Sequence, residues 1–381
     1  MKYICTDFYE EFSCIGGKCI DSCCQKGWGI SIDRNTYDRY QALDEPLRSR
    51  ICSRIKADEN GVYRIVLDGD DRCPFLNGQN LCDIYSLISE SAMCYVCQVY
   101  PRETMQYYDV TMATLMLSCP EVARIVIEKK DPIIFRFMED EDEVSVGNAD
   151  WTLYNELINS LVIATDILQD RDLQLWQRLQ LVLVEANIVQ EHIEKQDLQM
   201  IRESIECLRE KEYRQKIYAG DRTNPFAGAL KWNWIYSLFE SLVSCKGLHA
   251  GERNVLEKFR TIDPEDEQTY QMWNSEFKSL DLDIEYENIA VQCIFEYYMD
   301  ALKGRSLYVN VTKMLVFLLL VRTLEVIGYH TKKELTVTDK TLIIAKISEV
   351  VEHSKILEVL AENIVNRNDQ MEILRMIGMF N

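Results

Sequence analysis

Beyond residue 150, hydrophobic residues recur at helical spacing almost without interruption. Leu157, Leu161 and Leu168, for example, share one side of a helix with about 3.6 residues per turn. The run Met314–Val321 is apolar on every side, which predicts a central, fully buried helix. The whole pattern predicts helices over residues 154–168, 176–193, 198–217, 229–245, 251–260, 267–280, 284–303, 306–328, 338–353 and 355–379.

The first third of the chain alternates short elements with turns. Asp33 is a predicted N-cap, and Pro46 is a predicted start for a second short helix. The β-branched run Val62–Leu67 predicts a strand. Residues 83–99 are predicted to be largely helical, and residues 107–117 favour a pair of strands without excluding a helix.

These patterns predict a mainly α protein in which the N-terminal part is α+β. We expect a cysteine-rich lobe with a few short strands over residues 1–130, and an acidic linker or surface loop over 131–150. An all-helical domain follows over residues 151–381. A chain of 381 residues is long enough for two or three domains.

The net charge of −20 excludes some classes of partner. Non-specific binding to nucleic acid depends on neutralising phosphates, and anionic membranes also attract basic proteins. We therefore expect neither a nucleic-acid nor a membrane partner. The opening MKYICTDFYEEF has no apolar core of the secretory type, so a cytoplasmic location is expected.

Cysteine is concentrated in the first third of the chain. Of 14 cysteines, 11 lie at or before Cys119, and the remaining Cys207, Cys245 and Cys293 are scattered. We interpret those three as small buried apolar residues. A reducing cytosol disfavours structural disulfides, so the dense group is predicted to bind metal or to be catalytic.

Nine cysteines form the candidate metal site. Cys94-x2-Cys97 has the spacing of a metal-binding hook, and Cys19-x3-Cys23 is a second one. The four histidines lie far away in sequence, so the site is rich in thiolates and suits zinc and an iron–sulfur cluster equally well. A subset of the nine is expected to ligate the metal: Cys14, Cys19, Cys23, Cys24, Cys73, Cys82, Cys94, Cys97 and, as a further candidate, Cys119.

Several common catalytic motifs are absent. Lys26 stands where a radical SAM cluster would need the third cysteine of C-x3-C-x2-C. The chain also lacks the G-x-G-x-x-G and G-x4-G-K-[ST] nucleotide fingerprints, the nucleophile elbow G-x-S-x-G and the zincin motif H-E-x-x-H. A Rossmann-type enzyme is therefore unsupported by the local sequence.

The order of cysteine motifs resembles the flagellin lysine-N-methylase family. The resemblance lies in F-S-C-x4-C-x3-C-C-x2-G-W-x-I-x-I-D-x2-T-x3-Y, C-P-F-L-x4-L-C-x-I, C-x2-Y-P-R and S-C-P-E-x-A-R. These motifs occupy Phe12–Tyr40, Cys73–Ile84, Cys97–Arg102 and Ser118–Arg124. The CPFL to YPR portion is also similar to a broader family of small bacterial cysteine proteins that chelate zinc or iron.

The resemblance implies methyl transfer from S-adenosylmethionine (SAM) to lysine ε-amines of flagellin, the expected partner. It also implies a bound metal centre, favouring iron–sulfur, with zinc as the alternative. Glu287, Asn288 and Tyr297 lie in a weaker late match and are candidate cofactor contacts. A non-catalytic zinc or iron–sulfur protein, acting as a metal carrier or a scaffold, is the alternative function.

Overall fold

A computed structural model describes residues 2–25, 29–69, 72–139, 150–219, 223–278, 280–352, 354–366 and 370–380. Three parts of the sequence interpretation lie outside these ranges. They are the Gly27-Trp28 pair of the first motif, the end of the acidic turn at Asp70-Asp71, and residues 140–149 of the expected acidic linker. The division of the chain at residues 130 and 150 stays a prediction.

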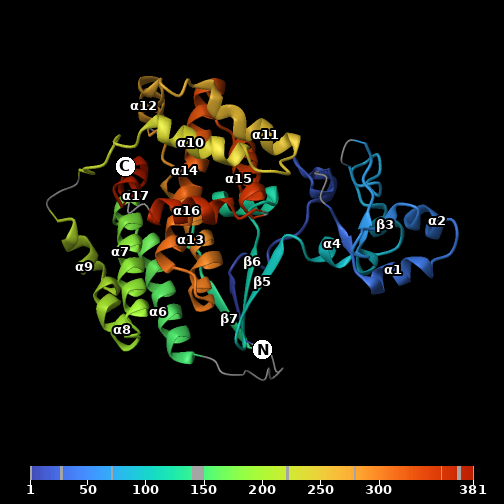
Figure 1. Cartoon of the computed structure of the whole chain (residues 1–381), viewed down its shortest axis with the longest axis horizontal. Helices are drawn as coiled ribbons and strands as arrows, with labels where there is room; N and C mark the ends of the chain where they lie inside the picture. The colour runs from blue at the N-terminus through green and yellow to red at the C-terminus, as the bar shows by residue number, and fades with distance from the viewer. Residues whose placement is uncertain are drawn as a thin grey trace.

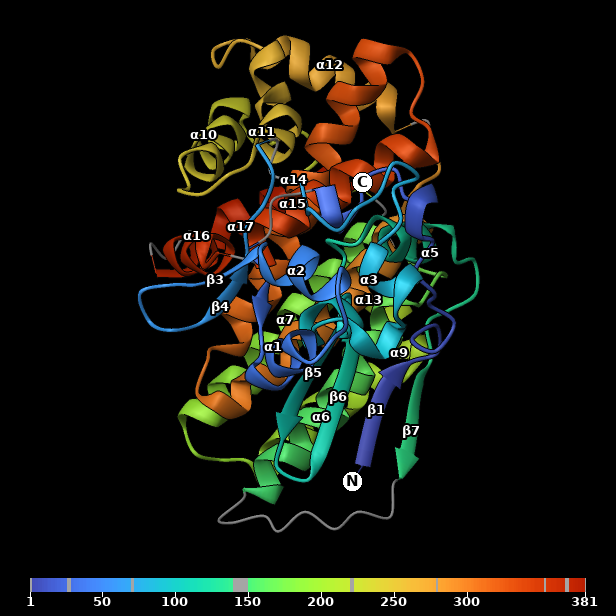
Figure 2. The same ribbon diagram turned by 90° about the vertical axis from the view of Figure 1, so that its right-hand side faces the viewer.

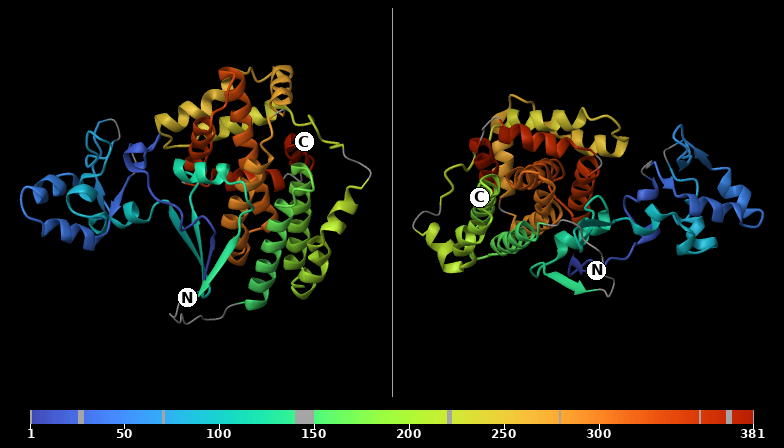
Figure 3. Two further views of the ribbon diagram at one scale, coloured as in Figure 1. Left: turned by 180° about the vertical axis from the view of Figure 1, so that it is seen from behind. Right: turned by 60° about the horizontal axis from the view of Figure 1, so that its bottom comes forward.

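Two separate hydrophobic cores organise the described residues. The smaller core lies between Ile30 and Cys97 and belongs to a lobe that stands beside the rest of the molecule (Figure 1). The larger core joins the helices to a four-stranded sheet and begins at Ile4. Two further views show the same separation of the lobe from the helical body (Figure 3).

The four-stranded sheet connects the lobe to the helical body. Its strands are β1 (Lys2–Thr6), β5 (Arg102–Tyr107), β6 (Val110–Leu115) and β7 (Phe135–Glu139), in the order β5-β6-β1-β7. β5 and β6 form an antiparallel hairpin, so the extended interpretation of residues 107–117 is confirmed. β1 pairs in parallel with β6 and antiparallel with β7, so the lobe is inserted between two neighbouring regions of one sheet.

The lobe is built from short elements. Its strands are β2 (Ser31–Ile32), β3 (Ile55–Ala57) and β4 (Tyr63–Ile65), and its helices are α1 (Arg34–Gln41), α2 (Leu47–Cys52), α3 (Asp83–Leu87) and α4 (Tyr95–Val99). Asp33 caps α1 as predicted, because its side chain accepts a hydrogen bond from the backbone N–H of Thr36. Residues 83–99 form two short helices rather than one, with a single 3-10 turn, η3 (Glu90–Ala92), between them.

The rest of the chain is helical, as the hydrophobic spacing predicted. The helices are α5 (Pro120–Glu128), α6 (Trp151–Leu168), α7 (Leu175–Glu194), α8 (Gln199–Ile205), α9 (Lys211–Ile217), α10 (Trp232–Val243), α11 (Ala250–Leu256), α12 (Glu267–Phe277), α13 (Asp283–Tyr297), α14 (Leu307–Lys332), α15 (Val337–Glu352), α16 (Ile356–Asn366) and α17 (Gln370–Ile377). Short 3-10 turns lengthen several of them: η4 (Glu206–Arg209), η5 (Glu257–Thr261), η6 (Tyr298–Lys303) and η7 (Gly378–Phe380).

Helix α14 is the centre of the helical body. Every residue from Asn310 to Gly328 is buried, which confirms the prediction of a fully buried helix around Met314–Val321. It packs against α7, α13, α15 and α16. Among the described residues, no helix combines the length and the apolar character needed to cross a membrane.

Candidate functional site

Thiols from separate segments gather in the core of the lobe. Cys73 and Cys94 are buried there, and Cys24, Cys82 and Cys97 pack against them. The loop that carries CPFL folds back on itself, because the N–H of Asp83 donates to the carbonyl of Phe75 at 2.7 Å. The backbone N–H of Cys73 donates to the carbonyl of Cys24 at 2.9 Å. This hydrogen bond connects the loop to the first cysteine segment, by which we mean Cys14–Cys24.

The thiols also act on one another electrostatically. A hydrogen bond from Cys97 lowers the pKa of Cys94 to about 7, and one from Cys23 lowers the pKa of Cys24 to about 7. Burial raises the pKa of Cys73 to about 12, and nearby thiolates, including Cys24, add to this rise. These interactions place Cys23, Cys24, Cys73, Cys82, Cys94 and Cys97 within range of one another.

The remaining candidate thiols lie differently. Cys14 is exposed, and Cys19 is partly buried in the same segment. Cys119 belongs to the larger core, at the start of α5. Across the ranges that the structure describes, no three Cys, His, Asp or Glu side chains already stand in metal-ligating positions.

The donor set nevertheless fits a soft metal centre. Six converging thiols offer sulfur ligands only, which is the ligand chemistry of zinc and of iron–sulfur clusters. A folded metal site also draws its ligands together when the metal binds, because ligation and local folding are coupled. The six thiols named above are therefore the residues that would hold such a centre.

The lobe contacts the helical body through its first cysteine segment. Asp21 forms an ion pair with Lys346 of α15, with 2.6 Å between Oδ2 and Nζ. The hydroxyl of Tyr100 lies 3.2 Å from that of Ser118, and charge on Cys23 acts on Tyr100. Figure 2 shows the lobe in front of the body, with the strands of the larger sheet emerging below it.

An enclosed acidic cluster lies next to this contact. We call it the junction cluster: Glu103 of β5, Glu296 and Tyr297 of α13, Lys313 of α14 and Glu352 at the end of α15. Burial raises the pKa of Glu296, and the carboxylates of Glu352 and Glu103 raise it further. Burial likewise raises the pKa of Glu352 to about 7. Two carboxylates this close favour a state in which they share a proton.

Solvent reaches the junction cluster although it is enclosed. Glu103, Glu296, Tyr297 and Glu352 each keep partial exposure. Protein atoms nevertheless surround Glu296, Tyr297 and Glu352 on nearly all sides, which is why burial dominates their pKa shifts. Charged side chains in such a position are candidates for binding a ligand.

The three predicted cofactor contacts fall in two environments. Glu287 is fully buried and forms ion pairs with Arg171 and Arg178, at 2.8 and 2.6 Å. The amide of Asn288 donates to two backbone carbonyls, those of Val126 and Lys129. Tyr297 alone belongs to the junction cluster, so the structure does not bring the three together; their role at a cofactor stays a prediction.

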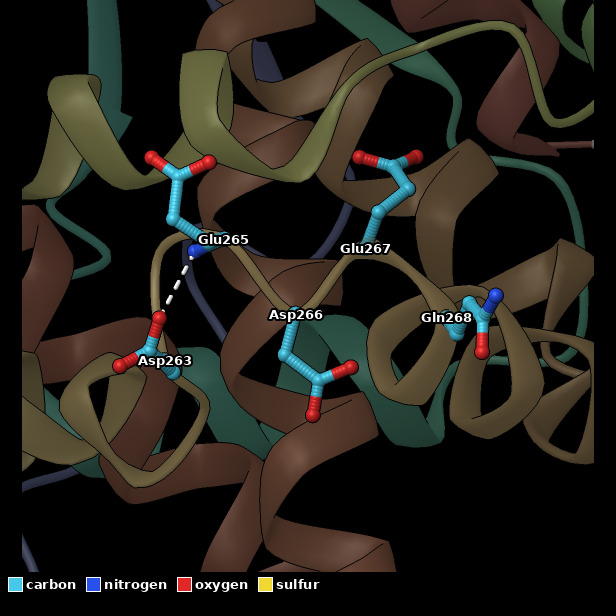
Figure 4. Close-up of a pocket in the computed structure, with 5 residues that line it drawn as sticks. All are labelled: Asp263, Glu265, Asp266, Glu267 and Gln268. Atoms are coloured by element: carbon cyan, nitrogen blue, oxygen red, sulfur yellow. Dashed lines mark hydrogen bonds between the residues drawn. The ribbon is translucent and has the colours of Figure 1, made fainter.

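A second acidic feature lies far from the lobe and has a structural explanation. Asp263, Glu265, Asp266, Glu267 and Gln268 line a surface hollow where η5 meets α12 (Figure 4). Asp266 caps α12 by accepting from the N–H of Thr269, and Glu267 accepts from the N–H of Trp232. These two carboxylates therefore stabilise the starts of α12 and of the neighbouring helix α10.

Comparison with known families identifies the helical body. The family model of the FliB lysine N-methylase C-terminal domain matches residues 162–378, more than half of the chain. This chain belongs to the FliB lysine N-methylase family. The matched region carries four members of the junction cluster (Glu296, Tyr297, Lys313 and Glu352), while the lobe thiols and Glu103 lie outside it.

Curated relatives cover a smaller part of this FliB-family chain. It is 31% identical over 129 residues to the flagellar biosynthetic protein FliU of Salmonella muenchen, covering 32% of this chain and 76% of that protein. The lysine-N-methylases of Salmonella typhimurium (strain LT2) and Salmonella choleraesuis are also 31% identical over 129 residues, covering 32% of this chain and of each relative. The chain thus aligns with about a third of the length of these two enzymes. No solved structure matches it significantly.

Sequence reasoning missed most of the junction cluster. Glu103, Lys313 and Glu352 come from three elements that are far apart in the chain, and none of the three is itself part of a motif. One signal was present. Lys313 borders the most apolar run in the sequence, where a charge is unexpected.

Proposed function

We propose that this chain is a SAM-dependent protein-lysine N-methyltransferase that acts on flagellin. The observation that carries the proposal is the family match across α6–α17. Its relatives named lysine-N-methylase and flagellar biosynthetic protein agree with it. The net charge of −20 also suits a lysine-bearing substrate.

Methylation places two demands on the protein. The lysine ε-amine must be neutral, although its ordinary pKa is about 10.4. The amine nitrogen must also lie in line with the methyl carbon and the departing sulfur. An enclosed site next to carboxylates serves the first demand, because burial disfavours the ammonium and a carboxylate accepts its proton. The junction cluster offers both features.

We also propose that the lobe thiols hold a metal centre, for which we favour an iron–sulfur cluster over zinc. When bound, such a centre would join the first cysteine segment, the CPFL loop and α4 by sulfur ligation. This proposal includes a cytoplasmic location, because the reducing cytoplasm keeps thiols free of disulfides and available as metal ligands. The converging donor set supports this part of the proposal.

The test of methyl transfer uses purified full-length protein, labelled SAM and unmodified flagellin. We expect label on flagellin lysines and none when SAM is replaced by S-adenosylhomocysteine. Unlabelled flagellin, with the metal fully loaded, would contradict the proposal. It would favour the alternative that the converging thiols suggest, a non-catalytic metal carrier or scaffold.

The metal is tested separately. Protein purified without oxygen is analysed for iron, sulfide and zinc, and its visible spectrum is recorded. Iron and sulfide in similar amounts with a brown colour are expected. A colourless protein that contains zinc alone would contradict the iron–sulfur assignment and leave methyl transfer open.

A further inference from the structure

Lys313 is buried without a direct ion-pair partner among the described residues. The residue is only 6% exposed. Among the described residues, its Nζ has neither a hydrogen-bond acceptor nor an ion-pair partner, and its nearest recorded contact is the ring of Tyr297, 3.9 Å from Nζ to the centroid. A buried ammonium without an acceptor is costly, and a cation–π contact offsets only part of that cost. Such a group is expected where a ligand supplies the missing acceptor.

Glu352, which carries the opposite charge, also has an atom without a hydrogen-bond partner among the described residues. Its Oε1 accepts hydrogen bonds from the N–H of Ser118 and the hydroxyl of Ser348. Its Oε2 is buried and has no hydrogen-bond partner among the described residues. A carboxylate oxygen accepts strongly from N–H groups, so an unused one is the expected contact of a ligand ammonium.

The ammonium of Lys313 and the Oε2 atom of Glu352 both belong to the junction cluster. Lys313 interacts electrostatically with Asp300, Glu296 and Glu358, and Glu296 does so with Glu352. Glu103 adds a third carboxylate from β5. Carboxylates therefore outnumber ammonium groups within the cluster, and the ring of Tyr297 offers an aromatic face beside them.

This combination matches an amino acid that carries an additional positive charge. The carboxylate of such a ligand would accept from Lys313, and its ammonium would donate to Glu352. The additional charge would lie close to Glu296 and Glu103. SAM has these three groups: a carboxylate, an ammonium and a sulfonium.

We propose that the junction cluster binds the methionine moiety of SAM, with Lys313 at its carboxylate and Glu352 at its ammonium. This rests on the SAM-dependent function proposed above. It relies neither on Glu287, whose charge Arg171 and Arg178 already balance, nor on Asn288.

The test measures binding rather than turnover. Calorimetry on the full-length protein uses two probes: S-adenosylhomocysteine, which carries the amino-acid group, and 5′-methylthioadenosine, which lacks it. Lys313→Met should weaken S-adenosylhomocysteine about 10-fold or more, because a charge-assisted hydrogen bond is lost. The same variant should leave the affinity for 5′-methylthioadenosine within about 2-fold of wild type, because this probe has no group that contacts Lys313.

Two further variants sharpen the result. Glu352→Gln keeps the oxygen that accepts from Ser118 but removes the charge, and it should also weaken S-adenosylhomocysteine selectively. Lys303→Met is the matched control, because Lys303 also lies over a tyrosine ring, that of Tyr107, but is half exposed and already paired with Asp300. It should leave both affinities unchanged.

The outcomes separate this inference from the proposed function. Equal affinity of wild type and Lys313→Met for S-adenosylhomocysteine, or an equal loss for both probes, would overturn the inference and leave the methyltransferase proposal standing. Unchanged binding of S-adenosylhomocysteine together with a raised KM for flagellin would also overturn it, since Lys313 would then act on the protein substrate and not on the methionine moiety. Failure of the wild type to bind SAM at all would overturn the proposed function itself.

Discussion

At the scale of single residues, Lys313 and Lys346 form an informative pair. Both residues are 6% exposed. Lys346 has two acidic partners, Asp21 at 2.6 Å and Glu349 at 3.0 Å, whereas Lys313 has none among the described residues. Burial is therefore compensated by ion pairs at Lys346 but destabilises the charged form of Lys313. A buried charge that is kept although it destabilises the fold is typical of a functional site.

Methionine substitution should consequently change stability in opposite directions at the two positions. Lys313→Met removes a buried, unbalanced charge and keeps the apolar stem, so it should stabilise the free protein by about 1 kcal/mol. Lys346→Met removes the ammonium that lies 3.0 Å from the buried carboxylate of Glu349 and should destabilise by about 3 kcal/mol. Thermal melting of both variants, without ligand, checks this. A loss of stability with Lys313→Met would mean that its contact with Tyr297 outweighs its desolvation.

Glu185 provides a pH test that is independent of the thiols. It is fully buried, accepts hydrogen bonds from Ser160 and Tyr298, and has its pKa raised by burial to about 7. Because the folded state holds this proton more tightly than the unfolded state, the resulting stability is present at low pH. It is lost as the pH rises from about 4.5 towards 7, by up to about 3 kcal/mol.

Glu185→Gln should remove this contribution. The melting temperature of wild type should fall more steeply between about pH 5 and pH 7.5 than that of the variant. Glu325 is also buried, and its pKa is likewise raised to about 7, so the variant keeps part of the slope. Identical slopes would show that Glu185 is ionised throughout this range.

Residue-level patterns were only partly informative in the sequence. The N-cap Asp33 and the helix start at Pro46 follow from local chemistry, and both occur. Contacts between residues far apart in the chain decide which polar side chains find a partner. They give Lys346 its acidic partners and leave Lys313 and Oε2 of Glu352 without a direct one. Local sequence does not encode such contacts.

At the scale of elements, most helices were predictable and most strands were not. Helical spacing placed α6, α7 and α14 to within a few residues, because each buries its own hydrophobic face. β1 and β7 were missed, since β1 becomes a strand by pairing with β6 and β7, more than 100 residues away. The helix predicted over residues 83–99 is interrupted, and Cys94 stands at the start of the second half, α4.

Cys97 in α4 and Cys73 in the CPFL loop allow the proposed metal site to be tested by removing single thiols. Cys97→Ser and Cys73→Ser should each lower the bound metal and destabilise the lobe, because serine oxygen is a poor ligand for a soft metal and metal binding is coupled to folding. Cys207→Ser is the control, because Cys207 lies in the helical body and is exposed; the interpretation of this cysteine as a buried apolar residue was wrong. Metal analysis and melting are the measurements. Retained metal with unchanged melting would remove those two thiols from the ligand set.

At the scale of the whole molecule, the lobe and the helical body meet where the chemistry is proposed. The thiol cluster lies on one side of the contact between Asp21 and Lys346, and the junction cluster lies on the other, around Glu352. The cysteine motifs pointed to the lobe, and the helical spacing pointed to the body. Their relative placement follows from the insertion of the lobe between β1 and β5, which the sequence does not reveal.

The central claim is methyl transfer to flagellin lysines, and mass spectrometry of flagellin peptides tests it most directly. Unmodified flagellin is incubated with the metal-loaded protein and SAM carrying a deuterated methyl group. We expect deuterated methyl groups on lysine ε-nitrogens, strongly reduced with Lys313→Met and unaffected by Lys303→Met. Flagellin without any deuterated lysine, in the presence of protein that is loaded with metal and binds SAM, would contradict it.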